Sequence, residues 1–240
     1  MKRKAIIIYC SNTKSGKLNG PVKDNENFRE HLTGNIGGNW YDHEVISMPN
    51  PTRQEVLDEI KRSQGCDYTF IVFTGHGAFE ENARRQHMEV ADGDITISDI
   101  KTTAPRQTII IDACRGFFTE FKKSLQENKM FSMDSLLISR STRKIFEDVI
   151  EAAPEGLTVL YAASENQTAM DTNNGAAYLI SLIESATDWE KQRGSSVLDL
   201  KRAHEKAIEY LKENFEDTIQ VPALNQEKRT VYFPFAVKLT

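Results

Sequence analysis

The sequence predicts a single domain of the α/β class, in which a mostly parallel sheet is covered by helices on both faces. Short apolar runs rich in isoleucine and valine, such as Lys4–Cys10 and Tyr68–Thr74, are typical of parallel strands buried on both faces. Helical segments separate these runs, and such alternation predicts a parallel sheet. The chain has 240 residues without an internal repeat or a break in composition, so one domain over 1–240 is expected.

The expected elements follow one another along most of the chain. In order, the strands are Lys4–Cys10, His43–Met48, Tyr68–Thr74, Thr108–Asp112, Thr158–Ala163 and Val231–Val237. The helices are Asp24–Leu32, a helix opening at Thr52, Ile145–Ala152, Ala176–Ile183 and Leu198–Leu211. Thr52 and Glu55 form a capping-box pattern. Val90–Ile97 is expected to be a hairpin that turns at Asp92-Gly93, and Phe117–Arg143 a long loop with some helix.

Composition and charge exclude two classes of partner. Lys plus Arg number 30 and Asp plus Glu 35, giving a net charge of −5, which is not the electrostatic footprint of a nucleic-acid-binding protein. No apolar run reaches the length of about 18 residues that a membrane span needs.

The three cysteines, Cys10, Cys66 and Cys114, are too few and uneven for a disulfide framework. A reducing, cytoplasmic location is therefore expected.

Two reactive side chains follow neighbouring strands of the predicted sheet. Thr74-Gly75-His76-Gly77 ends the third strand, and Ala113-Cys114-Arg115-Gly116 follows the fourth. Ligand sites in such sheets form beyond the carboxyl ends of the strands. An imidazole beside a thiol stabilises the reactive thiolate and later protonates a leaving amine. Cys114 and His76 are thus candidates for a catalytic dyad, with the amides of Gly77 and Cys114 placed to donate to an oxyanion. A small buried hydrophobic residue for Cys114 and a turn residue for His76 are the alternatives. Cys10 and Cys66 are expected to lie away from this edge.

These segments resemble those of a known family. Ile109–Gly116 resembles the nucleophile segment of caspases and metacaspases, and Phe73–Gly77 resembles their histidine segment. Further similarities are found in Leu18–Asp24, Ile95–Ile100, Tyr161–Ser164, Gln167–Asp171, Val221-Pro222 and Tyr232–Phe235. The resemblance covers nearly the whole chain and extends to prokaryotic caspase-like peptidases.

The resemblance implies a caspase-like three-layer sandwich, with a mostly parallel six-stranded sheet and helices on both faces. It divides the single domain into a large-subunit-like part over 1–116 that carries the dyad, a flexible linker region over 117–150, and a small-subunit-like part over 151–240. Arg140, Arg143 and Lys144 lie in a polar part of that linker and are candidate sites of self-cleavage. The implied activity is that of a cysteine endopeptidase, a thiol hydrolase acting on proteins or peptides.

One residue departs from animal caspases and predicts the substrate. Those enzymes carry Gln two residues before the nucleophile, and Asp112 stands here, as in metacaspases. Residues at i and i+2 of a strand point the same way, so the carboxylate of Asp112 is expected beside Cys114. It would attract Arg or Lys and repel Asp before the scissile bond. Asp24, Asp171 and Ser164 are the other candidate substrate-binding residues. A helix cap for Asp24, an ordinary loop position for Asp171 and a structural acceptor for Asp112 are the alternatives.

Cofactors and partners are less constrained by the sequence. No cofactor or metal is expected. Glu80, Glu81, Asp92 and Asp94 suit a calcium site, as in some metacaspases, but a solvated acidic loop is the favoured interpretation. Activation is expected to come from an activating partner protein, a ligand or autoprocessing. A role as a regulated effector in stress or antiviral defence follows from the resemblance to prokaryotic members.

Two other functions compete with peptidase activity. Ser11–Lys17 is a polar Gly/Lys loop after the first strand, which suggests a nucleotide- or flavin-binding domain. Its spacing fails the phosphate-loop pattern, which needs Gly where Ser11 stands and Ser or Thr where Leu18 stands. The second alternative is a catalytically silent scaffold with the caspase fold. Cleavage of a fluorogenic peptide separates the peptidase from both.

Overall fold

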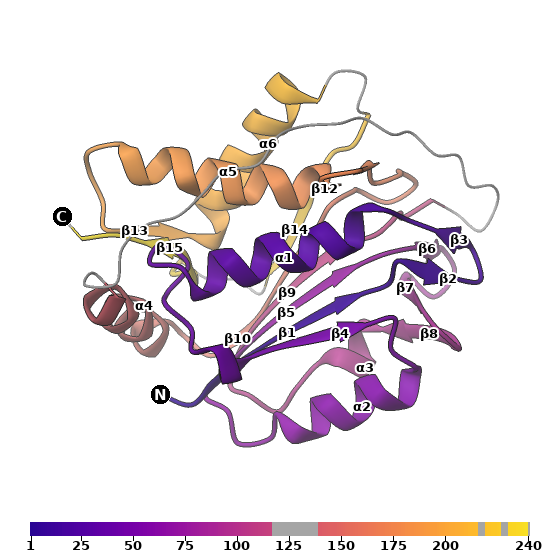
Figure 1. The fold of residues 1–240 in the computed structure, drawn as a ribbon, viewed down its shortest axis with the longest axis horizontal. Coiled ribbons are helices and arrows are strands. Elements are labelled where there is room, and N and C mark those ends of the chain that lie inside the picture. The colour runs from indigo at the N-terminus through magenta and orange to yellow at the C-terminus, as the bar shows by residue number, and fades with distance from the viewer. Residues whose placement is uncertain (117–138, 216–218, 227–229, 240) are drawn as a thin grey trace.

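The structure is a computed structural model that describes residues 1–116, 139–215, 219–226 and 230–239 (Figure 1). Its centre is a six-stranded sheet in the order β14-β10-β9-β5-β1-β4. The strands are β1 (Arg3–Tyr9), β4 (Val45–Pro49), β5 (Tyr68–Thr74), β9 (Arg106–Asp112), β10 (Gly156–Tyr161) and β14 (Ala223–Gln226). All neighbours pair in parallel except β10 and β14, which are antiparallel. The predicted fold class is confirmed.

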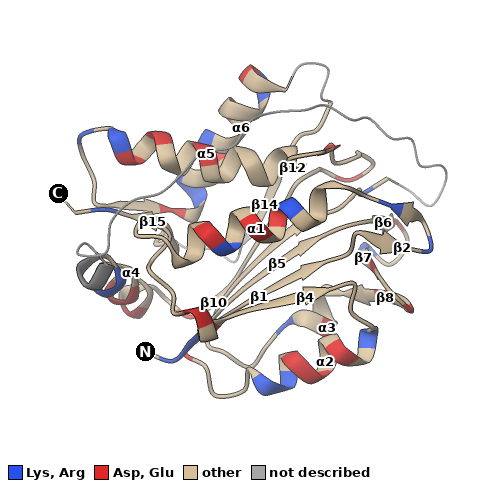
Figure 2. Cartoon of the chain, viewed as in Figure 1, with Lys and Arg blue, Asp and Glu red and all other residues tan. Residues whose placement is uncertain are grey.

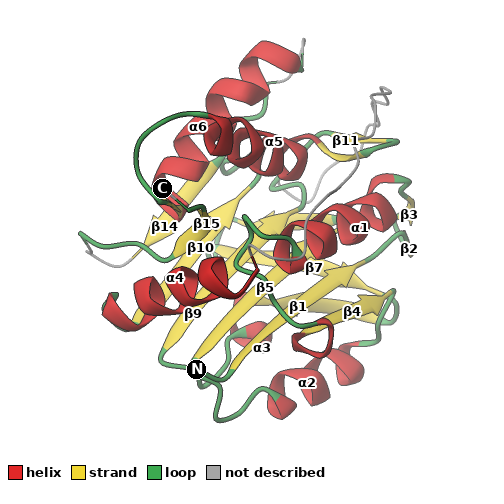
Figure 3. Ribbon diagram, turned by 60° about the vertical axis from the view of Figure 1, so that its left-hand side comes forward, coloured by secondary structure: helices red, strands yellow, loops and turns green. Residues whose placement is uncertain are grey.

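Apolar residues cover both faces of the central strands, and this is why the sheet forms the middle layer of three. Side chains alternate along β1, so that Ala5 and Ile7 belong to one core cluster whereas Ile6 and Ile8 belong to the other. One cluster is completed by helices α1 (Gly20–Thr33), α4 (Ser139–Ala152), α5 (Ala177–Lys191) and α6 (Leu200–Asn214). The other is completed by α2 (Arg53–Arg62) and the short α3 (Ile97–Ile100) (Figure 3).

Smaller β-elements surround the central sheet. The largest is an antiparallel sheet of β6 (Gly77–Glu80), β7 (Arg85–Val90) and β8 (Gly93–Thr96). The β7–β8 turn lies where the hairpin was predicted. Two-stranded ribbons pair β2 (Asn12–Thr13) with β3 (Gly16–Lys17), β11 (Asp171–Thr172) with β12 (Gly175–Ala176), and β13 (Val197–Asp199) with β15 (Pro234–Val237). A 3₁₀ turn, η1, spans Asp42–Glu44.

Three elements differ from the sequence-based expectation. The sixth strand of the main sheet is Ala223–Gln226, whereas the predicted strand Val231–Val237 contributes only β15, which pairs with β13 outside that sheet. Val197–Asp199 forms β13 before α6, and the Asp199 carboxylate caps α6 by accepting from Arg202 N–H at 3.0 Å.

The capping box at Thr52 is confirmed, because Thr52 N–H donates to the Glu55 carboxylate at 2.8 Å.

Helix α4 begins inside the segment that was expected to be a loop and a flexible linker. Arg143 lies in this helix, donates to the two carboxylate oxygens of Glu44 at 2.8 and 2.7 Å, and pairs with Glu147 at 3.0 Å. A residue held in a helix by such contacts is not presented as an extended substrate, so we expect no cleavage after Arg143 while α4 is folded. Residues 117–138 and the side chain of Arg140 lie outside the described part of the chain, so self-cleavage there stays a prediction.

Most charged residues lie outside the central sheet, although a few, such as Asp24 and Asp112, are buried. Figure 2 shows acidic and basic positions interspersed along α1, α2 and α5, while the central strands are almost free of charge. Within the described ranges, no helix is long and apolar enough to cross a membrane.

Candidate active site

The register between β5 and β9 brings His76 and Cys114 to the same edge of the sheet. The two strands pair in parallel with Thr74 opposite Asp112, so each reactive residue lies two positions beyond a matched pair. The pairing continues past the strands, because Gly75 N–H donates to the Asp112 carbonyl at 3.1 Å. The structure therefore places both residues of the predicted dyad at the same edge of the sheet, and the ladder between two central strands fixes where their segments leave it.

Gly77 allows the histidine segment to lie close to the nucleophile segment. A Cβ atom at Gly77 would lie 2.7 Å from the Cβ of Ala113 and 2.7 Å from the carbonyl oxygen of His87. Only glycine fits between them without displacing backbone. Glu89 N–H donates to the His76 carbonyl at 2.9 Å and so fixes the turn that carries the imidazole.

Gln86, which sequence reasoning missed, holds the backbone at the nucleophile. Its side chain is buried on β7 and donates to the carbonyls of Cys114 at 3.1 Å and of His87 at 2.9 Å. Its carbonyl oxygen accepts from Arg115 Nε at 3.1 Å. This role depends on contacts between distant parts of the chain, and nothing in the local sequence around Gln86 indicates it.

The Cys114 thiol lies in an environment that disfavours its charged form. The thiol points toward the carbonyl of Ala169, with 3.9 Å between sulfur and oxygen. Burial raises its pKa above the ordinary value, and the carboxylates of Asp112 and Asp171 raise it further. In the free protein the thiol is therefore held neutral, and a nearby cation is needed to favour the thiolate.

Three carboxyl groups from distant parts of the chain lie near one another, and two of them, those of Asp112 and Asp171, act on Cys114. Asp112 ends β9, Asp24 lies within α1, and Asp171 opens β11. Asp24 is fully buried and accepts from the Thr74 hydroxyl at 2.5 Å and from Ala176 N–H at 2.8 Å. Since α1 begins at Gly20, the alternative of a helix cap for Asp24 is wrong. We call these three residues the acidic cluster.

The acidic cluster carries unfavourable electrostatic energy. Burial raises the pKa of Asp112 well above its ordinary value, and the charges of Asp24 and Asp171 add to the shift. Burial likewise raises the pKa of Asp24 to about 7. The Oδ2 atom of Asp112 is buried and has no hydrogen-bond partner among the described residues. A carboxylate oxygen in that position lacks compensation, because native proteins normally pair buried polar atoms.

Glycines make room for two members of the acidic cluster. A Cβ atom at Gly20 would lie 1.7 Å from Asp171 Oδ1, and one at Gly175, whose φ is +125°, would lie 2.5 Å from Asp24 Oδ1. Asp171 also accepts from Gly20 N–H at 3.3 Å, at the positive end of α1. The start of α1 therefore positions one carboxylate and leaves the other two to be compensated elsewhere.

Ser164 lies in the loop that supports the nucleophile, but its hydroxyl is used within the protein. It donates to the Val221 carbonyl at 2.8 Å. The same loop pairs with Arg115, because Arg115 N–H donates to the Gln167 carbonyl at 2.8 Å and Asn166 N–H donates to the Arg115 carbonyl at 2.9 Å. Ser164 thus helps to hold the 164–167 loop against the segment that follows Cys114.

Cys10 lies closer to this edge than the sequence suggested. Its N–H donates to the Thr74 carbonyl at 2.9 Å, and its side chain packs under Gly75. The expectation that Cys10 lies away from the edge is wrong, because β1 is the direct neighbour of β5 and ends beside it. Complete burial raises the pKa of Cys10 to about 12, so its thiol is unreactive.

The residues behind the calcium and nucleotide alternatives have other contacts. Glu80 and Asp94 flank His87 at 3.1 and 3.8 Å, and the described part of the chain holds no group of three or more His, Cys, Asp or Glu placed to bind a metal ion. In the loop after β1, the Thr13 hydroxyl and Ser15 N–H donate to the Glu89 carboxylate. A carboxylate already occupies the donors that a phosphate would need.

Comparisons with known proteins show the family and support the fold. A family model of the caspase domain matches residues 2–234, and the chain belongs to the caspase family. Comparison with curated proteins gives no significant match. A crystal structure of caspase-1 from Spodoptera frugiperda is similar, with a TM-score of 0.62, 12% identity and coverage of 93% of this chain and 86% of that one. A protein from Geobacter sulfurreducens has a TM-score of 0.64, 14% identity and coverage of 99% of both chains.

The acidic cluster predicts a pH-dependent cost to stability. Folding raises the pKa of Asp112, so its contribution to stability is present below its unfolded pKa of about 3.9 and is lost as the pH rises through the folded value. Asp112→Asn removes the charge at nearly constant shape. We expect the variant to be more stable than the wild type at pH 8 by about 1 kcal/mol or more, and the difference to vanish near pH 4. Urea unfolding at both pH values measures this, and lower stability of the variant at pH 8 would contradict it.

Proposed function

We propose that the protein is a cysteine endopeptidase that cleaves proteins after Arg or Lys through Cys114 and His76. The observation that carries the proposal is the buried Oδ2 atom of Asp112, which has no hydrogen-bond partner in the described part of the chain. Asp112 lies two residues before the nucleophile. Together with Asp24 and Asp171 it forms a site with excess negative charge. A cationic side chain of a substrate supplies what that site lacks.

The bound cation also prepares the nucleophile. A guanidinium or ammonium group beside the acidic cluster favours the ionised carboxylates and so lowers their pKa values. It forms charge-assisted hydrogen bonds that the free protein does not make. The negative charges that raise the pKa of Cys114 are then compensated. A substrate with an acidic residue at this position would instead add a fourth negative charge, which gives discrimination as well as affinity.

The chemical steps follow from the two residues at the sheet edge. His76 accepts the thiol proton of Cys114, and the sulfur attacks the carbonyl carbon of the scissile peptide bond. The amides of Gly77 and Cys114 donate to the resulting oxyanion. His76 then protonates the leaving amine as the carbon–nitrogen bond breaks, which leaves a thioester on Cys114. Water, deprotonated by His76, hydrolyses the thioester and releases the carboxyl product.

The cellular role extends the same proposal. Membership of the caspase family supports a role as a regulated peptidase. We propose that the protein acts in the cytoplasm as an effector in a stress or defence pathway, and that a partner protein or a ligand activates it. The raised pKa of Cys114 fits a nucleophile that stays inactive until a substrate or another signal arrives.

The dyad is tested by substitution of each member. We expect Cys114→Ala and His76→Ala each to lower kcat/KM for an arginyl peptide by about 10³-fold or more, with unchanged circular dichroism. The matched control is Cys66→Ala, which removes a buried thiol that precedes β5 at the opposite end of the strand. A Cys114→Ala variant with wild-type activity would show that the protein is not a cysteine peptidase of this type.

Substrate preference is tested with peptides that differ only before the scissile bond. We expect wild-type kcat/KM to be highest for Arg and Lys, low for the neutral isostere citrulline, and lowest for Asp. Asp112→Asn should lower kcat/KM for Arg by about 30-fold, corresponding to about 2 kcal/mol for an unpaired buried charge, and should reduce the difference between Arg and citrulline. Asp58→Asn, an exposed substitution on α2, serves as the control. Preference for Asp, or an unchanged Arg preference in Asp112→Asn, contradicts the assignment.

A further inference from the structure

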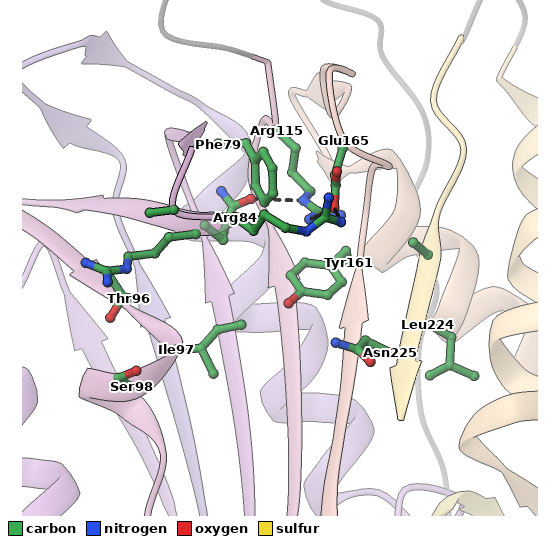
Figure 4. Close-up of a pocket in the computed structure, with 14 residues that line it drawn as sticks. Phe79, Arg84, Thr96, Ile97, Ser98, Arg115, Tyr161, Glu165, Leu224 and Asn225 are labelled. Atoms are coloured by element: carbon green, nitrogen blue, oxygen red, sulfur yellow. Dashed lines mark hydrogen bonds and ion pairs between the residues drawn. The ribbon is translucent and has the colours of Figure 1, made fainter. Parts of the chain in front are cut away.

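A second site lies on the face of the sheet opposite to the acidic cluster. Asp112 and Asp24 are on the side of α1 and α5, whereas Tyr161 and Ile97 belong to the core on the side of α2 and α3. On that second side, a cavity of about 530 Å³ opens between the β6–β8 sheet, α3 and strands β10 and β14 (Figure 4). The peptidase mechanism does not use this cavity.

The cavity carries excess positive charge. Arg84, Arg85 and Arg115 line it together with a single acidic residue, Glu165. The carboxylate of Glu165 pairs with Arg84 at 3.0 Å and lies 3.7 Å from Arg115. Within the described ranges, Arg85 has no hydrogen-bond or ion-pair partner for its guanidinium group. Arg84 and Arg115 thus share one carboxylate, Arg85 adds an exposed third cation to the lining, and an anion is the ligand that would balance them.

Arg115 is a rigidly held member of this site. Its side chain is buried, donates to Gln86 Oε1 at 3.1 Å and to the Ala163 carbonyl at 3.3 Å, and lies over the rings of Tyr161 and Phe79 at 4.2 and 4.8 Å. Figure 4 shows its guanidinium group converging with Glu165 and Arg84 above Tyr161. Ser98 and Asn225 add polar groups to the wall. A polar cavity in which one cation, Arg115, is held rigidly beside two exposed arginines can bind a small anion.

We propose that this cavity binds a small organic anion bearing phosphate or carboxylate groups, and that binding there regulates the nucleophile. The anion competes with Glu165 for the guanidinium groups of Arg84 and Arg115. Glu165 belongs to the 164–167 loop, whose backbone pairs with Arg115 and which leads to Ala169 and Asp171 beside the Cys114 thiol. Release of Glu165 therefore acts on the loop that shapes the catalytic edge. The regulatory part of this proposal rests on the proposed peptidase function, whereas the binding part does not.

Binding is tested by isothermal titration calorimetry on the full chain with pyrophosphate and citrate at constant ionic strength. We expect at least one of the two to bind, and the double variant Arg84→Gln/Arg85→Gln to weaken its affinity about tenfold or more. Arg193→Gln, which removes an exposed arginine after α5, is the matched control and should bind as the wild type does. Preference for pyrophosphate identifies a phosphorylated ligand, and preference for citrate a carboxylate. Binding of neither probe, or equal binding by the double variant, overturns the proposal.

Competition between the anion and Glu165 predicts that one substitution strengthens anion binding, in contrast to the arginine substitutions, which weaken it. Glu165→Gln removes the internal carboxylate, and we expect it to tighten anion binding several-fold. A variant that merely disturbed the loop would weaken binding instead, and that result contradicts the competition. A peptide aldehyde ending in arginine is a ligand for the catalytic edge. Coupling between two sites is reciprocal, so the aldehyde should change the affinity for the anion by a certain factor, and the anion should change the affinity for the aldehyde by the same factor. Anion binding without such coupling overturns the regulatory part of the proposal alone. If the protein shows no peptidase activity, calorimetry still tests the binding part independently.

Discussion

The parallel pairing of β5 with β9 is the constraint on which the other features depend. These two strands lie in the middle of the sheet, with every residue of β5 buried, and their register sets Thr74 opposite Asp112. His76 and Cys114 each follow two residues after their member of this matched pair. Because neighbouring strands flank this pair on both sides, neither segment can shift by a residue without turning its apolar side chains to the wrong face. The rigidity of the core is thereby transferred to the edge where the chemistry is expected.

The acidic cluster is costly to the fold in the absence of a ligand. Thr74, Ala176 and Gly20 supply donors to two of its members, but Asp112 keeps a buried oxygen that no described residue contacts by a hydrogen bond. Stability alone would favour an amide or apolar residue there. A binding site accepts this cost because the free energy is recovered when the complementary charge arrives, so that affinity and selectivity come from the same destabilised groups. The neutral thiol of Cys114 fits this arrangement, since its ionisation is opposed by the same charges.

The sequence predicted the fold class and the common sheet edge of His76 and Cys114 because their signals are local. Apolar runs mark β1, β5 and β9, and the polar turns directly after β5 and β9 carry His76 and Cys114. Strand β14 was missed because it has only four residues and lies at the edge of the sheet, where polar residues such as Asn225 are tolerated. Helix α1 begins at Gly20, before the predicted start at Asp24, because Pro21 occupies its first turn, where proline is favoured. Gln86 and the partners of Asp24 depend on contacts between distant residues, which no periodicity encodes.

The pairing of β9 with β10 has a consequence for a chain that has been cut. These two strands lie on either side of residues 117–138, and they pair in register from Arg106 opposite Gly156 to Ile111 opposite Tyr161. Helix α4, which follows that segment, is tied to the amino-terminal part through Glu44 and Arg143. Peptide-bond breakage between 116 and 139 would therefore produce two polypeptides that remain one particle. Such a molecule would run as two bands in detergent and as one species on a sizing column, and the loss of a covalent link would not separate the halves of the sheet.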